Sequence, residues 1–184
     1  MALIDQHAGA KAVEERLSRT TDPRQRAMLE TVAEHLRAEV VGDVGRLLAT
    51  LVDDPVYHLW SDGHDVGPRG VNGVLNYYSE LVAARRQILE FAVERIVVDA
   101  DTVVTEGWIR AINLGAVARA RGWHVEDDEA SYLVTQRVVI FWPFDRDGRM
   151  LGEDGYANLD PEAVQRLEDS ELPEAYRQLF AGAS

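Results

Sequence analysis

The stretch that decides the fold runs from Asp43 to Trp60 and reads DVGRLLATLVDDPVYHLW. Its first half repeats apolar residues at the spacing of one helix face, namely Val44, Leu47, Leu48, Leu51 and Val52. Asp43 stands where a helix cap is expected. Pro55 cannot donate a helical hydrogen bond and moves Asp54 away from helical angles. We therefore predict a helix over 44–52, followed by an extended segment over 56–60.

The preceding segment predicts a longer helix over 23–41. Asp22 and Pro23 are typical of an N-cap and a first helical residue, with Gln25 at the capping-box position. Gly42 is placed to end this helix in a left-handed conformation. Before it, Val13 and Leu17 are four residues apart among charges, which predicts an N-terminal helical extension over 1–21.

After Trp60 a third helix is expected over 71–82, and then the pattern becomes that of strands. Strands over 91–98 and 102–112 flank a turn at 99–101, and a long strand over 131–142 ends at Pro143. The Asp147-Gly148 turn leads into a last strand over 150–159. Asp160 and Pro161 predict a helix after that strand, and a helical tail is expected over 169–184.

Three helices followed by an antiparallel sheet define an α+β fold, with one main domain over 22–168. The longest strand has to curl, and a curled sheet closed by helices encloses a pocket. With 46% hydrophobic and 28% charged residues, the chain has the composition of a water-soluble protein. It has no apolar run of membrane-spanning length, and its first residues lack the pattern of a signal peptide, so we expect a cytoplasmic protein.

The charge and the cysteine content narrow the function further. A net charge of −13 repels phosphate backbones, so we expect no nucleic-acid partner, and we expect no membrane association either. The chain contains no cysteine, which excludes thiolate nucleophiles and thiolate metal sites. We find no phosphate loop or dinucleotide fingerprint, and therefore expect no cofactor.

From about residue 24 to 167, this order of elements resembles the nuclear transport factor 2-like superfamily, which includes SnoaL-like polyketide cyclases and bacterial ketosteroid isomerases. The residues that carry the resemblance are Val41-Gly42-Asp43, Asp53-Asp54, Gly70 with Tyr77-Tyr78, and Phe144 to Gly148. The resemblance implies a cone-shaped, curved antiparallel sheet around a mostly apolar cavity, closed by three N-terminal helices. It also implies a homodimer.

The active-site pattern of ketosteroid isomerases is not retained in this chain. Counted without gaps from the shared motifs, the three positions of that pattern fall on His35, Leu59 and Ile140. The aspartate that SnoaL-like cyclases carry on the long strand also has no counterpart, because Val138, Ile140 and Trp142 are apolar. Any chemistry must therefore use other groups.

Four residues are candidates for acid-base chemistry. His35 lies at the edge of an apolar helix stripe, where an imidazole titrates near neutrality or is simply bonded to a backbone carbonyl. Tyr57 and His58 are adjacent on a strand and point to opposite faces, so only one of them enters the cavity. The family register favours Tyr57, and a shift by one residue favours His58. Counted from Gly148, the family register implies that Glu153 points inward as a desolvated acid or base, or else it pairs with an arginine at the pocket mouth.

The walls of the pocket follow from strand alternation. Gln136, Val138, Ile140 and Trp142 share one face of the long strand, and we expect them to bind substrate together with Tyr78. Gln136 either anchors a ligand or pairs with a strand edge. On the neighbouring strand, the face that carries Glu106, Trp108 and Arg110 is expected to point outward, because the opposite face is smaller and less charged.

The segment 114–130 is long for a hairpin connection and is expected to fold over the pocket as a lid. It contains His124 beside Glu126, Asp127 and Asp128. A single histidine in an acidic loop is weak evidence for a metal site, and we expect none.

These observations predict a SnoaL-like small-molecule enzyme that isomerises, cyclises or dehydrates an apolar, cyclic substrate by acid-base chemistry. In this hypothesis His35 and Tyr57 donate to a substrate oxygen, and Glu153 or His58 moves the proton. The alternative is a noncatalytic ligand-binding or scaffolding domain of the same fold, which the apolar residue at Ile140 favours. A transport adaptor is the third option, but no protein-binding groove is indicated.

Overall fold

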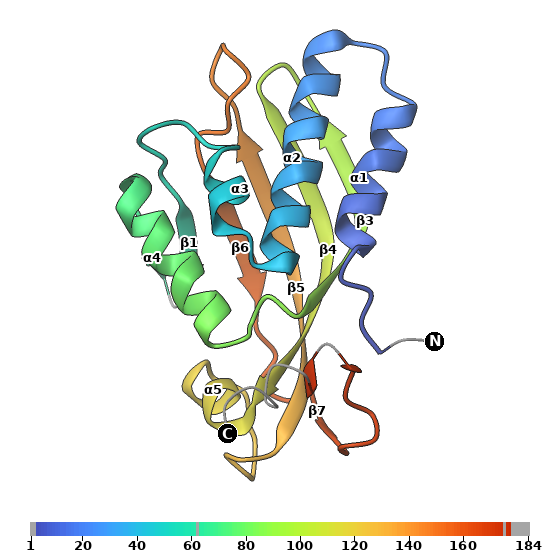
Figure 1. Cartoon of the computed structure of the whole chain (residues 1–184), viewed down its shortest axis with the longest axis vertical. Helices are drawn as coiled ribbons and strands as arrows, with labels where there is room; N and C mark the ends of the chain where they lie inside the picture. The colour runs from blue at the N-terminus through green and yellow to red at the C-terminus, as the bar shows by residue number, and fades with distance from the viewer. Residues whose placement is uncertain (1–2, 62, 175, 178–184) are drawn as a thin grey trace.

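The computed structural model of the chain describes residues 3–61, 63–174 and 176–177 (Figure 1). The helices are α1 (Ala8–Ser18), α2 (Pro23–Val41), α3 (Val44–Leu48), α4 (Gly70–Ala83) and α5 (Gly115–Ala120). The strands are β1 (His58–Ser61), β2 (His64–Asp65), β3 (Leu89–Val98), β4 (Thr102–Leu114), β5 (Ser131–Pro143), β6 (Asp154–Asn158) and β7 (Val164–Leu167).

The strands form a curved, unclosed seven-stranded sheet in the order β2-β1-β6-β5-β4-β3, with β7 paired to the first residues of β5. Strand β1 runs parallel to β6, whereas the β3-β4, β4-β5 and β5-β6 pairs are antiparallel. Helices α1 to α4 lie over one face of this sheet (Figure 1). The predicted α+β class, with a curved sheet covered by N-terminal helices, is confirmed.

The residues predicted to start and stop the first helices do so. The Asp22 carboxylate accepts a hydrogen bond from the Gln25 amide at 2.9 Å, and Gly42 ends α2 with a left-handed φ of 73°. Asp43 then caps α3. The prediction that this helix continues to residue 52 is wrong. It ends at Leu48, because the chain turns and the Val52 amide donates to the Met150 carbonyl in the sheet layer.

The helix predicted after Asp160 is also wrong, because that segment contains strand β7. The Asp160 carboxylate accepts from the Glu162 amide two residues later, which closes a turn instead of capping a helix. Val164 to Leu167 then pair with β5, and the Leu167 side chain is buried. Most of the tail expected over 169–184 lies outside the described residues.

The main core lies between the helices and the concave face of the sheet. Its largest buried side chains include Met28, Leu29, Tyr57, Trp142 and Met150. Helix α1 belongs to this core, because Val13 is fully buried and Gly9 lies directly against the Phe91 strand. The three N-terminal helices expected to close the cone are therefore joined by a fourth.

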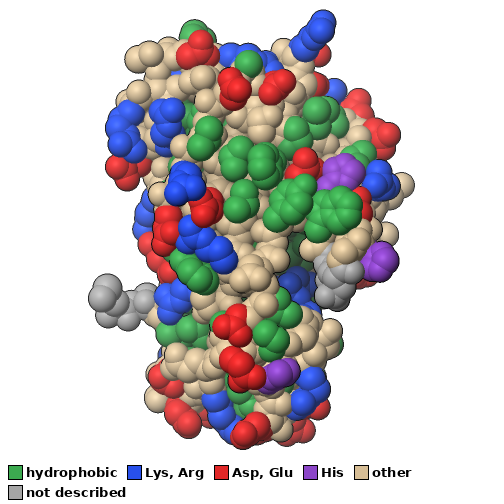
Figure 2. All heavy atoms as spheres, turned by 180° about the vertical axis from the view of Figure 1, so that it is seen from behind, with side chains coloured by type: hydrophobic (Ala, Val, Ile, Leu, Met, Phe, Trp, Pro, Cys, Tyr) green, Lys and Arg blue, Asp and Glu red, His purple; other side chains and the backbone are tan. Residues whose placement is uncertain are grey.

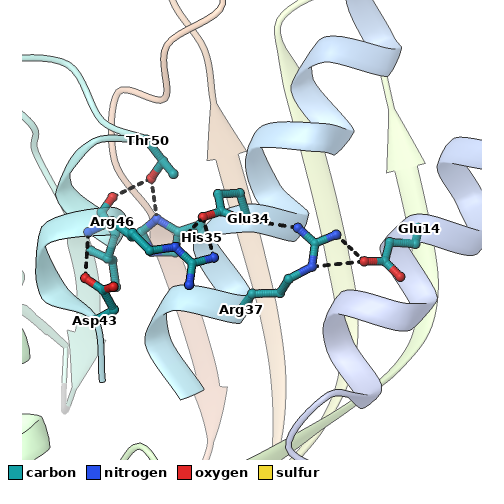
Figure 3. Close-up of polar contacts among 8 residues, drawn as sticks. Glu14, Glu34, His35, Arg37, Asp43, Arg46 and Thr50 are labelled. Atoms are coloured by element: carbon teal, nitrogen blue, oxygen red, sulfur yellow. Dashed lines mark hydrogen bonds and ion pairs between the residues drawn. The ribbon is translucent and has the colours of Figure 1, made fainter. Parts of the chain in front are cut away.

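The outer faces of the elements carry charges. On β4, Thr105 and Ala111 are buried, whereas Trp108 is exposed and Glu106 forms ion pairs with Arg137 and another arginine, as predicted for the convex side. The solvent side of α2 carries a further group, in which Glu34, Arg37 and Arg46 link α2 to α3 and Arg37 also pairs with Glu14 of α1 (Figure 3). These pairs hold the first three helices in register over the sheet.

In the part of the chain that the structure describes, no helix is both long and apolar enough to cross a membrane.

Two backbone segments approach closely at Gly152, just before β6, and we call this contact the Gly152 crossing. The φ of Gly152 is 152°, and a Cβ atom there would lie 1.8 Å from the Val56 carbonyl oxygen. Only glycine permits this approach, which brings the Glu153 carbonyl within 2.7 Å of the His58 amide and starts the β1-β6 pairing.

We expect Gly152→Ala to lower the free energy of unfolding by about 3 kcal/mol or more, since it adds a backbone clash to an unfavourable φ. Gly148→Ala is the matched control. Gly148 also has a positive φ, of 84°, but its surroundings are open, so its loss should stay near ~1 kcal/mol. Urea denaturation of both variants measures the difference, and equal losses would contradict the role given to the Gly152 crossing.

Candidate active site

A cavity of about 950 Å³ lies between the helices and the concave face of the sheet. Its apolar lining includes Leu36, Leu59, Leu89, Phe91, Ile109, Val138, Ile140 and Trp142. Its polar lining includes Glu39, Tyr77, Tyr78, Arg86, Arg119, Arg121, Gln136 and Glu153. A cavity of this size and composition suits a small, mostly apolar molecule held by a few polar groups.

Three side chains from different elements meet at the wall of this cavity. Glu153, just before β6, accepts a hydrogen bond from the Tyr78 hydroxyl of α4 at 2.7 Å. The same carboxylate oxygen lies 3.0 Å from Nε2 of His35 on α2. The Tyr78 oxygen lies 3.2 Å from that nitrogen as well. Glu153 and Tyr78 line the cavity, whereas His35 is fully buried behind them.

Thr50 fixes the tautomer of His35. Its hydroxyl lies 2.6 Å from the Leu47 carbonyl, to which it donates, and 2.7 Å from Nδ1 of His35 (Figure 3). Because the single hydroxyl proton is used by the carbonyl, Nδ1 has to carry a proton and donate to Thr50.

This assignment places a second proton inside the group. With Nδ1 protonated, a neutral His35 has a lone pair on Nε2, and a carboxylate 3.0 Å away would also present a lone pair. The contact is favourable only when one proton lies between Nε2 and the Glu153 oxygen. His35 and Glu153 therefore share a proton, and Tyr78 supplies another hydrogen bond to the same oxygen. Such a pair can release and take up a proton at the cavity wall.

Packing holds the group in place. The His35 ring contacts the Trp142 ring edge-on, with centroids 5.7 Å apart, and the Trp142 indole donates to Thr105 at 2.9 Å. The Gly152 crossing directs the next residue, Glu153, under the helix layer. These contacts restrict the rotamers of both proton-sharing residues.

Glu39 is a second carboxylate at the cavity, one helical turn after His35 on α2. Desolvation, and then the charge of Glu153, raise its pKa from the ordinary value of 4.5 to about 8, although the charge of Arg86 acts in the opposite direction. Sequence reasoning missed this residue. The i+4 spacing from His35 was the available signal, because it places both residues on one helix face.

Three tyrosines pack against one another beside the group of His35, Glu153 and Tyr78, and Tyr78 is one of them. The rings of Tyr77 and Tyr78 contact edge-on at 5.2 Å, and Tyr57 packs against Tyr78 at 6.2 Å. Burial and then the charge of Glu153 raise the pKa of Tyr77 to about 12, and raise those of Tyr57 and Tyr78 well above the ordinary value. All three therefore stay protonated at neutral pH and can donate a hydrogen bond in that range.

The structure brings together most of the residues that the sequence singled out, but not all. His35, Glu153, Tyr78, Gln136, Val138, Ile140 and Trp142 lie in or directly behind the cavity wall. Tyr57 points inward but lies beneath Tyr78, and its hydroxyl interacts with Tyr78 and Glu153 without making a hydrogen bond within 3.5 Å among the described residues. Tyr78, which was expected only to bind substrate, occupies the donor position expected for Tyr57.

His58 does not enter the cavity. It points to the opposite side of β1 from Tyr57, and its Nδ1 lies 2.7 Å from the carboxylate of Asp65 on β2. The Asp65 carboxylate also pairs with Arg69 and accepts from the Gly67 amide, so this histidine is part of a hairpin contact.

The predicted loop over 114–130 begins with helix α5 and closes one end of the cavity through Arg119 to Trp123. The helix was missed because its six residues are too short for a clear period. His124 lies 2.5 Å from Glu162 and is exposed, away from the acidic residues of its own loop.

Comparison with known proteins supports the fold. No protein-family model matches the sequence, and no curated protein matches it. Among solved structures, a protein described as a SnoaL-like polyketide cyclase from Shewanella putrefaciens aligns with a TM-score of 0.61 at 13% identity, covering 79% of this chain and 86% of that one. An epoxide hydrolase/cyclase-like enzyme with a role in pyran ring formation in salinomycin aligns at 0.54 and 13%, covering 76% and 95%.

A Mycobacterium tuberculosis protein in complex with estradiol-17beta-hemisuccinate aligns with a TM-score of 0.53 at 19% identity, covering 76% of this chain and 98% of that one. These structural alignments establish the fold, but identities this low leave the activity open. The chain therefore has the nuclear transport factor 2-like fold that SnoaL-like proteins share, as its sequence predicted.

Replacing Tyr78 and Tyr57 separately tests the hydrogen-bond assignment. We expect Tyr78→Phe to cost about 1–3 kcal/mol of folding free energy, because it removes a donor from a buried carboxylate. Tyr57→Phe removes a hydroxyl without a hydrogen bond, so it should be neutral within ~0.5 kcal/mol or stabilising. Urea denaturation at pH 7 compares the two variants. Equal costs would contradict the assignment.

Glu39 should make stability depend on pH. Its folded pKa of about 8 exceeds the ordinary 4.5, so between these values the folded state holds a proton that the unfolded state has lost. Stability should fall as the pH rises through this range. We expect the free energy of unfolding of Glu39→Gln, relative to that of the wild type, to increase by at least ~1.4 kcal/mol, the equivalent of one pKa unit, from pH 5 to pH 8. Denaturant titrations measure this, with Glu30→Gln on the exposed side of α2 as control. A constant difference would contradict the raised pKa.

Proposed function

We propose that this protein is a small-molecule enzyme of the SnoaL-like kind, which isomerises, cyclises or dehydrates an apolar, cyclic substrate by general acid-base catalysis. The observation that carries the proposal is the hydrogen-bonded group of His35, Glu153 and Tyr78 at the wall of a largely apolar cavity of about 950 Å³.

Each member of the group has a distinct part in this mechanism. When the shared proton lies on His35, Glu153 is a carboxylate and can remove a proton from a substrate carbon next to a carbonyl. The Tyr78 hydroxyl can turn from Glu153 to the substrate oxygen and stabilise the charge that develops there. Glu153 then returns the same proton at another carbon, or to a leaving hydroxyl, so no other reactant is needed.

His35 acts only through Glu153, because its ring is buried and does not reach the cavity. It is therefore a positioning residue that holds the shared proton. His35 and Glu153 are buried, and burial strengthens the hydrogen bonds between them relative to solution.

The neighbours in structure support the substrate class. Two of them are described as a cyclase and an epoxide hydrolase/cyclase-like enzyme, and a third was solved with a steroid ester in place. A fused-ring molecule of that size fits a cavity of about 950 Å³.

A noncatalytic ligand-binding domain is the second candidate. It is favoured by Ile140, an apolar residue at the position where ketosteroid isomerases carry an acidic group on the long strand. In that case the His35-Glu153 pair would serve the architecture of the cavity alone.

We also propose that two copies associate through the outer face of the sheet. Trp60, Phe141 and Tyr156 are exposed there, and the last two rings contact edge-on at 5.9 Å. Figure 2, seen from the side opposite the helices of Figure 1, shows apolar side chains gathered across this face. A contiguous exposed apolar patch can mark a protein–protein interface. Light scattering at micromolar concentration measures the oligomeric state, and a monomer would contradict this proposal.

The enzymatic proposal is tested with three probe substrates: a β,γ-unsaturated cyclic ketone, a β-hydroxy cyclic ketone and a hydroxy-epoxide. We expect the wild type to convert at least one of them, and Glu153→Gln to lower that rate by ~10²–10⁴, the contribution usual for a general acid or base. Mass spectrometry of products made in D₂O follows the proton transfer.

Glu126→Gln is the matched control, because Glu126 is an exposed carboxylate outside the cavity lining. Equal rates for Glu153→Gln and the wild type would contradict the mechanism. Binding of the probes without conversion, detected as a rise in melting temperature, would favour the noncatalytic domain.

A further inference from the structure

Two arginines project into the cavity from different elements. Arg86 lies in the turn between α4 and β3, and Arg121 follows directly after α5. The two groups interact electrostatically, since the charge of Arg86, after burial, helps to lower the pKa of Arg121 to about 10. The Arg121 guanidinium lies over the Trp123 ring, 5.2 Å from its centroid. A chain of net charge −13 thus places two cations together at an apolar cavity.

Neither guanidinium has an anionic partner within 4.0 Å among the described residues, and the Arg86 Nε is buried without a hydrogen bond. Most other arginines of the chain are paired. Arg119, on the same wall as Arg121, lies 2.8 Å from the Asp128 carboxylate. A buried guanidinium nitrogen without an acceptor is unfavourable, and two neighbouring cations repel each other.

The protein groups around the pair do not neutralise it. Glu39 is close enough to Arg86 to interact electrostatically, but with a pKa of about 8 it is mostly uncharged at neutral pH. The charges of both arginines act to lower the pKa of Tyr77, but at about 12 this pKa still leaves the hydroxyl neutral. The wall formed by Arg86 and Arg121 therefore keeps its positive charge when the cavity is empty.

We propose that Arg86 and Arg121 bind a terminal oxyanion group, of the carboxylate or sulfonate kind, on a ligand whose apolar body fills the rest of the cavity. Guanidinium groups present parallel N–H donors that match the oxygens of such a group. The inference rests on the proposed function in that it concerns the same cavity, and it narrows the substrate class from apolar to amphiphilic and anionic.

The ligand would be held at two places. Glu153, Arg86 and Arg121 line one cavity of about 950 Å³, so one small molecule can contact both the acid-base group and the arginine pair. An anion bound by the arginines leaves the rings of the ligand free to contact Ile109, Val138 and Ile140. Binding the end that does not react would orient the reactive carbon toward Glu153.

The test uses two fluorescent probes with the same rings, 8-anilinonaphthalene-1-sulfonate and uncharged N-phenyl-1-naphthylamine. Titration of the full chain at low salt measures a Kd for each probe. We expect the sulfonate to bind the wild type about tenfold or more tightly than the neutral probe, as a charge-assisted contact allows. Arg86→Gln and Arg121→Gln should each weaken sulfonate binding about fivefold or more and leave the neutral probe within about twofold.

Arg149→Gln is the matched control, because Arg149 is already paired with Asp53 and lies outside the cavity lining, and it should change neither Kd by more than about twofold. Arg86→Lys keeps the charge and should retain most of the preference for the sulfonate, which guards against misfolding of Arg86→Gln.

Equal affinity of the wild type for the two probes, or equal loss for both probes in the arginine variants, would overturn the anion site. These measurements detect binding and need no turnover. A negative binding result would leave the acid-base proposal intact, and absence of turnover would leave the anion site intact.

Discussion

The contact between His35 and Glu153 joins the helix layer to the sheet, and the architecture of the cavity depends on it. Both groups are buried, so each needs a partner, and each finds it in the other. Thr50 and Tyr78 satisfy the remaining hydrogen bonds, so α2, α4 and the entry to β6 meet at one point. A shift of any of these elements would leave a desolvated polar group unpaired.

This arrangement concentrates polarity at one part of an otherwise apolar interior. Near the shared proton, burial favours neutral forms, which explains why Glu39 and the three tyrosines keep their protons. Arg86 and Arg121 line the same cavity and remain charged. If both proposals hold, the cavity combines a proton-transfer group with a cationic pair, and a ligand that is polar at both ends would suit it better than a plain hydrocarbon.

Much of this structure could be predicted from local sequence signals. Asp22, Pro23 and Gly42 delimit α2 because capping depends on neighbouring residues alone. The strands of the main hairpin follow from alternation, whereas the inward direction of Glu153 came from the register of the resembled family, counted from Gly148. Local signals gave a wrong prediction where pairing between segments distant in the sequence determines the structure. At β7, pairing with β5 overrides an apparent helix start at Asp160.

The details of the site were harder to predict for the same reason. Alternation puts Tyr57 and His58 on opposite faces, and the family register favours Tyr57 inside but does not give its depth, so Tyr78 was not expected as the donor above it. Glu39, Arg86 and Arg121 look like ordinary surface residues in the sequence, because elements far apart in the chain bring them to one cavity. The unpartnered Nε of Arg86 is visible only in three dimensions.

The parallel pairing of β1 with β6 has a consequence for how the protein is made. Tyr78 and Glu153 are 75 residues apart, and the Gly152 crossing belongs to the last third of the chain. During synthesis, α1 to α4 and the first strands leave the ribosome well before β6 exists, so the nascent chain presents an open apolar trough. The hydrogen-bonded group at its wall is among the last parts to assemble, and long-range pairing of this kind slows folding.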